Sequence, residues 1–397
     1  MIIKVNKHFL VDLLVYLPVS LYLIFNLLNT TFYAKYIPTT VYSIIYICSI
    51  LLLLLHELLV GKFSLNSILG VFVFFILAIL VILSEEGLSS YLYTLALIFL
   101  VRQFSFKKIS KVILILTTIF LIFTILSSKL GIIPDYVEVS SNRIRHYLGF
   151  RYSLFPSTVM LNITALYLYV KQSRIKLKEL IVLAVSILWI FLQTNSRLAF
   201  LSSSVLILVS LVLKFYPDLL KKTRYILLFF TPSFIYFAIV SYVIANRYVS
   251  AGSFLRVLNS FLGGRIYLAS KSISIYGFGW LGKQIQWIGN GLTTEGLKNT
   301  SSYLYVDNLY IQVLQRYGVL FLFIFITLLT ITMFILYKEK QYFLILILIL
   351  LAAYATIDDL EFRLHYNSFL LLLGTPFSME LIRLRLPISA DNAISDD

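Results

Sequence analysis

Long apolar runs separated by short polar segments dominate this chain of 397 residues. Many of the runs lie in apolar segments of roughly 17–25 residues, the length that an α-helix needs to cross the hydrocarbon core of a membrane. Because a backbone in lipid must satisfy its hydrogen bonds internally, these runs predict transmembrane helices. About twelve spans are expected, at residues 9–28, 39–55, 67–83, 88–101, 110–128, 155–170, 179–193, 197–213, 224–244, 309–336, 341–356 and 365–381.

The composition agrees with an all-α polytopic membrane protein. Hydrophobic residues make up 60% of the chain and charged residues 13%, whereas a soluble domain carries about 25% charged residues. The single cysteine, Cys48, excludes a disulfide framework and a thiolate metal site. No spacing of metal-ligating residues predicts a metal, and no cofactor is expected. Since no repeat or linker divides the chain, residues 1–397 are expected to form one integral membrane domain.

Lysine and arginine in the short connections set the expected orientation. The segments 102–111, 171–178, 214–224 and 337–340 are basic, and all of them fall on one side if there are twelve spans. By the positive-inside rule this side is the cytoplasm, and both termini share it. The net charge of +15 is then explained largely by cytoplasmic lysines near anionic lipid head groups, and no nucleic-acid partner is expected.

Arginine is distributed differently from lysine. Nine of the 14 arginines fall on the predicted outer side, where the topology rule asks for no basic residues. Arginine offers a planar fork that binds phosphate in two places and stays charged when desolvated. The outer excess therefore indicates phosphate recognition, although snorkelling to lipid phosphates remains open for each single residue.

Two of the predicted outer loops are long, namely residues 129–154 and residues 246–308. In the larger loop Leu255, Leu258 and Phe261 recur at helical spacing, which predicts short helices lying at the outer membrane surface. Glycine-rich turns follow these helices. Trp280 and Trp287 are expected to act as interfacial anchors.

Several polar residues at the outer ends of predicted spans are candidates for chemistry. Arg197 begins a span, Arg265 follows the pair Gly263–Gly264, and Asp307 with Asn308 precedes the longest span. Arg316 comes eight residues after Asn308, which predicts that the two side chains share a helix face. The other candidates lie in outer loops: Arg143, Arg145, His146, Arg151, Asp358, Glu361 and Arg363. Helix capping and internal ion pairs are the alternatives to a functional role.

Three motifs carry a resemblance to a known family. They are "NSRLAF" at the start of a span, "GGR" followed by "YGFGW" in the large loop, and "VDNLYIQVLQRYGVLFLFIF" leading into the next span. Their order resembles the O-antigen ligase/polymerase superfamily, and specifically the Wzy-type polysaccharide polymerases. In the family a histidine often precedes the asparagine of the last motif. Asp307 stands there in this chain, which favours a polymerase over a ligase.

The resemblance implies a GT-C-like membrane glycosyltransferase on the outer face of the bacterial cytoplasmic membrane. Its partners would be donor and acceptor glycans linked to undecaprenyl diphosphate, membrane lipids, a chain-length regulator and a flippase. Arg197, Arg265 and Arg316 would converge on the leaving diphosphate without a metal. Asp307 would be the general base, with Asp358 or Glu361 as second choices.

Further substrate-binding roles are expected from the remaining candidates. Asn308 would orient sugar or diphosphate, and Arg363 would bind substrate in the last outer loop. The residues Arg143, Arg145, His146 and Arg151 would hold the second lipid diphosphate. Three alternative functions stay open at this point: a ligase of the same fold, a flippase for lipid-linked oligosaccharides, and a peptidoglycan glycan polymerase.

Overall fold

The structure is a computed structural model that describes residues 7–61, 64–85, 89–140, 143–250, 252–299 and 301–378. It is mostly helical. The α-helices are α1 (Lys7–Leu28), α2 (Thr39–Val60), α3 (Leu65–Ser84), α4 (Ser90–Val101), α5 (Phe106–Lys129), α6 (Phe155–Lys171), α7 (Leu177–Thr194), α8 (Arg197–Phe215), α9 (Leu219–Lys222), α10 (Arg224–Phe229), α11 (Ser233–Arg247), α12 (Ser253–Phe261), α13 (Arg265–Tyr276), α14 (Leu309–Lys338) and α15 (Tyr342–Tyr354). Short 3-10 helices are η1 (Phe32–Tyr36), η2 (Gln172–Arg174), η3 (Tyr248–Ser250), η4 (Leu360–Phe362) and η5 (Ser368–Phe377). Two strands, β1 (Val137–Ser140) and β2 (Arg143–His146), pair antiparallel.

Seven helices of the described residues are long and apolar enough to cross a membrane: α1, α2, α3, α5, α7, α8 and α14. They confirm the expected helical membrane protein. The other five expected spans correspond to shorter or interrupted helices, so the count of twelve stays a prediction. The expected span 224–244 is split into α10 and α11 because Pro232 precedes α11 and has no N–H for a continuous helix. In place of the span 365–381 the described chain forms η5, and residues 379–381 lie outside the described residues.

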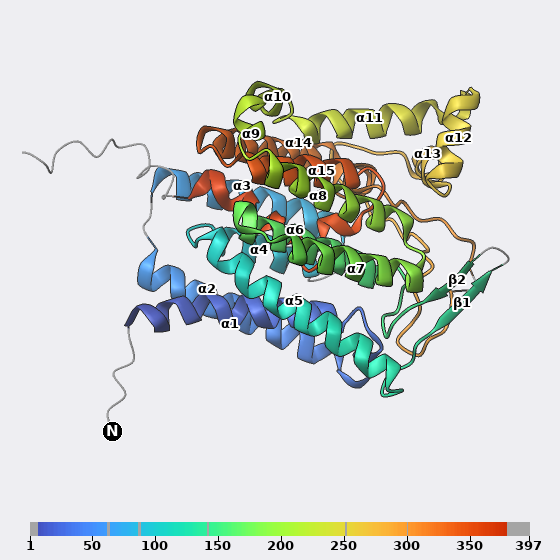
Figure 1. Cartoon of the computed structure of the whole chain (residues 1–397), viewed down its shortest axis with the longest axis horizontal. Coiled ribbons are helices and arrows are strands. Elements are labelled where there is room, and N and C mark those ends of the chain that lie inside the picture. Colours follow the sequence, from blue (N-terminus) through green and yellow to red (C-terminus); the bar gives the residue numbers. More distant parts are fainter. Residues whose placement is uncertain are drawn as a thin grey trace, which may run out of the picture.

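The long connections gather at one end of the helix bundle, which we call the loop end (Figure 1). It carries β1, β2, α12, α13 and the segment 277–308, whereas α9 and α10 lie at the opposite end. The two short helices expected in residues 246–308 are present as α12 and α13. Phe254, Val257 and Phe261 on α12 are all exposed, which suits an apolar face against lipid, but the placement of α12 at a membrane surface stays a prediction.

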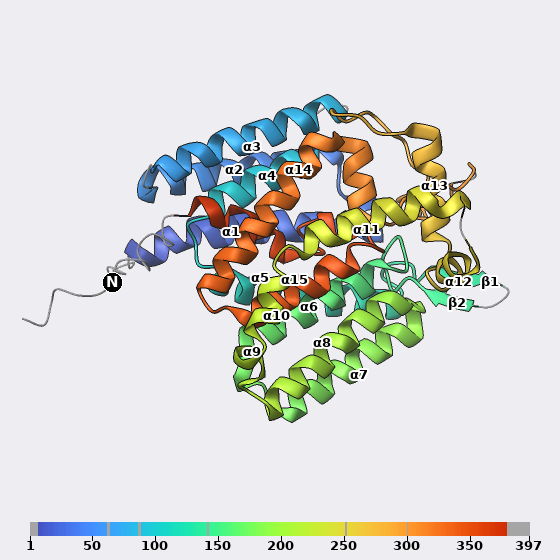
Figure 2. The same cartoon turned by 90° about the horizontal axis from the view of Figure 1, so that it is seen from above.

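Helix α14 is broken at Gly318, as its bend in Figure 2 shows. Gly318 has φ 89° and ψ 173°, so the helical hydrogen bonds stop there. The freed groups bind the chain that follows α13. Val319 N donates to Gly279 O at 2.9 Å, Leu320 N donates to Trp280 O at 3.2 Å, and Arg316 O accepts from Lys283 N at 3.1 Å. The glycine-rich turn expected near residue 277 thereby completes the backbone of a broken membrane helix.

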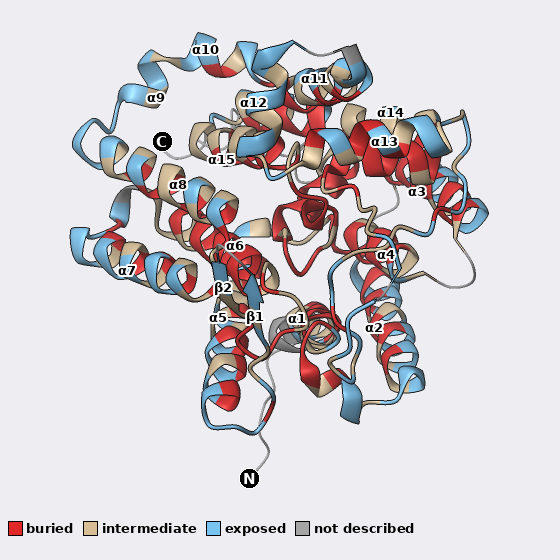
Figure 3. Cartoon of the chain, turned by 90° about the vertical axis from the view of Figure 1, so that its right-hand side faces the viewer, coloured by how far each residue is buried: buried red, intermediate tan, exposed pale blue. Residues whose placement is uncertain are grey.

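The connection between α15 and η5 lies in the packed centre of the molecule, which Figure 3 shows in red as seen from the loop end. A buried loop must satisfy its backbone polar groups within the protein. Here Leu309 N donates to Ala355 O at 2.9 Å, and Asn162 makes two hydrogen bonds with Ser368 at 2.9 and 3.1 Å. The connection therefore has a fixed path between α6 and α14.

Candidate functional site

A cavity of about 370 Å³ opens at the loop end. Its volume falls within the roughly 300–1,000 Å³ of small-molecule sites in proteins. Three separate parts of the chain form it: residues 151–155 before and at the start of α6, residues 287–307, and residues 358–363. Its charged and polar lining residues include Arg151, Arg363, Asp307, Asp358, Asp359, Asn290, Asn299, Tyr152, Tyr303 and Tyr305. The cavity thus combines two cations with three carboxyl groups.

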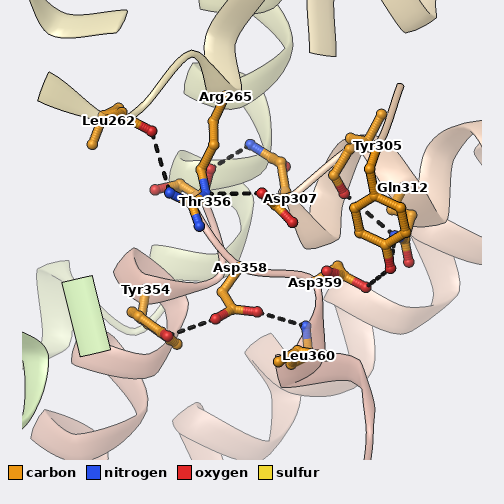
Figure 4. A network of polar contacts seen from close by, with 12 residues as sticks. Leu262, Arg265, Tyr305, Asp307, Gln312, Tyr354, Thr356, Asp358, Asp359 and Leu360 are labelled. Carbon is orange, nitrogen blue, oxygen red and sulfur yellow. Dashed lines mark hydrogen bonds and ion pairs between the residues drawn. The ribbon is translucent and has the colours of Figure 1, made fainter. Parts of the chain in front are cut away.

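Asp307 is held against Arg265 at the edge of this cavity (Figure 4). Arg265 Nε lies 3.2 Å from Asp307 Oδ2, with side-chain exposures of 16% and 13%. Arg265 is the first residue of α13, and Gly264 before it has φ 85°, a left-handed conformation that glycine adopts without strain. The glycine pair of the sequence motif therefore turns the chain so that Arg265 meets Asp307.

Helix α13 is fixed in this position by the first half of α14. Gln315 Nε2 donates to Ser272 O at 3.1 Å and to Gly277 O at 3.0 Å, and Ser272 Oγ donates to Gln315 Oε1 at 2.8 Å. Trp287 Nε1 donates to the same hydroxyl at 3.0 Å. These bonds join α13, α14 and the segment 277–308 into one support for Arg265.

The pKa of Asp307 is raised to about 7, chiefly by burial. Arg265 opposes this rise by favouring the charged form, and the negative charges of Asp359 and Asp358 add to it. A carboxyl group with a pKa near neutrality can accept and release a proton under physiological conditions. Asp307 therefore has the properties of a general base.

Asp358 and Asp359 lie near Asp307 in the connection after α15, but their carboxyl groups are turned to other partners (Figure 4). Asp358 accepts hydrogen bonds from Tyr354 Oη at 2.6 Å and from Leu360 N at 2.9 Å. Its pKa is raised, first by burial and then by the neighbouring Asp359. Asp359 accepts from Tyr305 Oη at 2.7 Å, and Gln312 Nε2 donates to that hydroxyl at 3.4 Å. The two carboxyl groups are thus fixed in orientation by neighbouring side chains.

Arg151 and Arg363 supply the positive charge of the cavity lining. Arg151 donates through Nη1 to Leu292 O at 3.4 Å and through Nη2 to Asn29 O. The Nε atoms of both arginines are buried and have no hydrogen-bond partner among the described residues. Both arginines bring positive charge to the cavity lining.

The structure does not bring Arg197, Arg265 and Arg316 to one shared cavity, and this expectation is wrong. Arg197 is the exposed first residue of α8. Arg316 Nη1 lies 3.8 Å from Glu85 Oε1 and its guanidinium stacks 4.8 Å from the Trp287 ring. Neither lines the cavity. Arg265 contacts the lining residue Asp307 and Arg316 contacts the lining residue Trp287, but none of the three arginines lines the cavity itself.

Asn308 also lies apart from the cavity lining. It caps α14 by accepting from Ile311 N at 3.1 Å, and its amide donates to Ser241 Oγ at 3.0 Å and Thr356 O at 2.7 Å. The expected common face of Asn308 and Arg316 is not formed, because eight residues turn an α-helix about 80° past two full turns. Asn308 instead connects α11, α14 and the connection after α15.

Glu361, expected as a polar residue of an outer loop, is buried in the interior. It is 1% exposed, and neither carboxylate oxygen has a hydrogen-bond partner among the described residues. It lies among apolar side chains that include Leu309, Phe325 and Leu351. Burial raises its pKa well above the ordinary value. Burial thus favours the neutral form of Glu361, which lies away from the cavity lining.

The other candidates of residues 129–154 lie at the hairpin, where their partners belong to the hairpin region and to the end of α7. Arg145 Nε donates to Thr194 O at 3.0 Å, and Arg145 Nη1 lies 3.8 Å from Glu138 Oε2. His146 Nδ1 lies 2.9 Å from Asp135 Oδ2. Arg143 is exposed on β2, and none of the three lines the cavity. Of the four candidates in this loop, only Arg151 does.

Sequence reasoning missed Asp359 and the tyrosines of the cavity. Asp359 stands beside Asp358 in the sequence. Tyr303, Tyr305 and Asp307 occupy every second position, a spacing that places the side chains of an extended segment on one side, and this spacing was the available signal. Among the described residues no group of three or more histidine, cysteine or acidic residues could hold a metal ion. Comparisons of the chain with protein-family models, with curated proteins and with solved structures return no match.

Proposed function

We propose that this protein is a membrane glycosyltransferase that polymerises oligosaccharide repeat units carried on undecaprenyl diphosphate into a surface polysaccharide. The reaction takes place on the outer face of the bacterial cytoplasmic membrane, at the loop end. The resemblance of three sequence motifs to Wzy-type polymerases supports this proposal. One observation carries it: a carboxyl group with a pKa near 7, ion-paired to an arginine, borders a cavity that two further arginines line.

In the proposed step a hydroxyl of the incoming repeat unit attacks the anomeric carbon of the donor glycan. A new C–O bond forms as the bond between the anomeric carbon and the diphosphate oxygen breaks. The diphosphate leaves with the electron pair, and the hydroxyl proton passes to the carboxylate of Asp307. The transition state has oxocarbenium character, and the anionic side chains of the cavity favour that positive charge.

The departing diphosphate needs fixed cations. Arg151 and Arg363 line the cavity with positive charge, so they are the proposed diphosphate ligands. Arg265 is a positioning residue in this scheme, because it contacts Asp307 and not the cavity space. Aromatic groups such as Tyr303, Tyr305 and Trp287 give the cavity the mixed apolar and polar lining typical of ligand sites.

Two features separate this proposal from its alternatives. A flippase is expected to place its polar site near the membrane midplane between two similar halves, whereas this cavity lies at one end of the bundle. A ligase would use the same leaving group with a different acceptor, and its motif has a histidine where this chain has Asp307. The polymerase is therefore the preferred function.

The proposal is tested by the length of the glycan on cells that lack this protein. We expect single repeat units on the cell surface, and restoration of long chains when the wild-type gene is returned. Loss of all exported repeats would instead indicate a flippase. Full-length polymer retained on its lipid carrier would indicate a ligase.

A further inference from the structure

A second cavity, of about 350 Å³, lies at the end of the bundle opposite the loop end. The proposed transfer reaction does not use it. It is formed where α4 passes into α5, where α6 and α14 end, and beside η5. Its polar lining includes Arg102, Ser105, Lys107, Gln172, Glu339 and Gln341. A polar cavity among apolar helices is a candidate binding site because buried polar groups need partners.

Arg102 is the buried cation of this cavity. Its side chain is 1% exposed, and Nη2 lies 2.6 Å from Glu57 Oε1 while Nη1 donates to Phe99 O at 2.9 Å. Its Nε has no hydrogen-bond partner among the described residues. The guanidinium is therefore held in a fixed position by Glu57 and Phe99, and Arg102 is one of the residues that line the cavity.

The first turn of α5 also faces this cavity, through Ser105, Phe106 and Lys107. Ser105 stands at the N-cap position, but its side chain makes no capping hydrogen bond. The first amides of a helix have no partner within the helix, and the helix dipole places partial positive charge there. A 24-residue helix with an uncapped start is thus a second source of donors for an anion.

The charges around the cavity favour an anion as well. Lys107 adds a flexible ammonium group to the lining, and Lys108, Lys111, Lys338 and Lys340 lie at the same end of α5 and α14. Glu57 already neutralises part of the Arg102 charge, and Glu339 is the acidic residue of the lining. The geometry points to a binding site for a phosphate-bearing anion, held by Arg102, Lys107 and the start of α5.

The test uses the purified full-length protein and its thermal unfolding, because a ligand that binds only the folded state raises Tm. Inorganic phosphate is titrated against chloride at constant ionic strength. In a separate arm the protein is placed in nanodiscs of phosphatidylcholine alone or with phosphatidylglycerol. Stabilisation by phosphate alone identifies a free anion, and stabilisation only by phosphatidylglycerol identifies a lipid head group. Either result supports the site, and stabilisation by neither overturns it.

Variants separate this site from a general effect of surface charge. Lys107→Gln removes a lining cation and is expected to weaken binding about tenfold, the effect of one charge-assisted hydrogen bond. Lys111→Gln is the matched control, since Lys111 is an exposed lysine one turn further along α5 and does not line the cavity. Glu339→Gln should tighten binding. Equal losses in both lysine variants, or weaker binding in Glu339→Gln, would overturn the proposal.

Discussion

Arg265 Nε lies 3.2 Å from Asp307 Oδ2, although 42 residues separate the two positions in the chain. Burial alone would move the pKa of Asp307 upward, and the guanidinium limits this rise so that the value stays at about 7. A base works best when its pKa is close to the working pH. The ion pair therefore sets the basicity of Asp307 as well as its position.

Replacing Asp307 by Asn is expected to abolish long-chain glycan and leave single repeat units. The amide keeps the shape of the side chain but cannot accept the hydroxyl proton, and loss of a general base lowers rates by about 10²–10⁴-fold. The measurement is glycan length on a gel, with protein amount in the membrane determined in parallel. Glu295→Gln is the control, because Glu295 pairs with Lys35 in an exposed contact outside the cavity and should leave chain length unchanged.

The pH dependence of kcat/KM should reflect the pKa of Asp307. Activity requires the carboxylate, so kcat/KM should rise with pH through a midpoint near the pKa of about 7. Arg265→Gln removes the charge that lowers this pKa, so the midpoint should move to higher pH. Asp359→Asn removes a charge that raises it, so the midpoint should move to lower pH. Shifts of the two variants in the same direction would contradict the assignment.

The arginines should divide into two groups. Arg151→Gln and Arg363→Gln remove cavity donors, and each should lower activity about 10- to 100-fold, since a hydrogen bond to a charged group is worth about 1.5–3 kcal/mol. Arg197→Gln changes an exposed residue outside the cavity and should keep wild-type activity. The rate of repeat-unit transfer by purified protein checks the division. A strong loss of activity in Arg197→Gln, with the protein at its wild-type level, would support the diphosphate-binding role that the sequence analysis expects for Arg197.

The helices were predictable because a helix that crosses a membrane needs an apolar run of about 20 residues, and such runs are visible in the sequence. The expected span at residues 309–336 is found as α14, Leu309–Lys338, although the helix is broken at Gly318. The break at Gly318 was not predicted, since its cause is the chain near Trp280, which meets α14 only in the folded structure. The split at Pro232 had a local signal in the proline itself.

Part of the site was predictable for a similar reason. Asp307, Arg265, Asp358, Arg151 and Arg363 stand out as polar groups beside apolar spans, and the structure places them in or next to one cavity. Arg197 and Arg316 are also polar residues beside apolar spans, but neither lines the cavity. Asp358 lines the cavity, whereas Glu361, three residues later in η4, lies among apolar side chains. Side-chain direction depends on tertiary packing, which composition and spacing do not specify.

Gly318 should be indispensable for the folded shape of α14. Its φ of 89° and ψ of 173° lie in a region essentially restricted to glycine, where another residue costs about 1–3 kcal/mol. A Cβ at this position would also lie 2.5 Å from Trp280 O and 2.6 Å from Leu281 C, both backbone atoms. Gly318→Ala is therefore expected to lower Tm clearly.

The matched control for this change is Gly252→Ala. Gly252 has φ −66°, and an added Cβ would meet nothing within 4 Å, so its replacement should change stability by roughly 0.5 kcal/mol or less. Thermal unfolding of both variants in detergent measures the difference. Because the first half of α14 supports Asp307 and, through Gln315, also α13, Gly318→Ala should lose transfer activity as well. Wild-type Tm and activity in this variant would mean that the break in α14 is not needed to hold the cavity together.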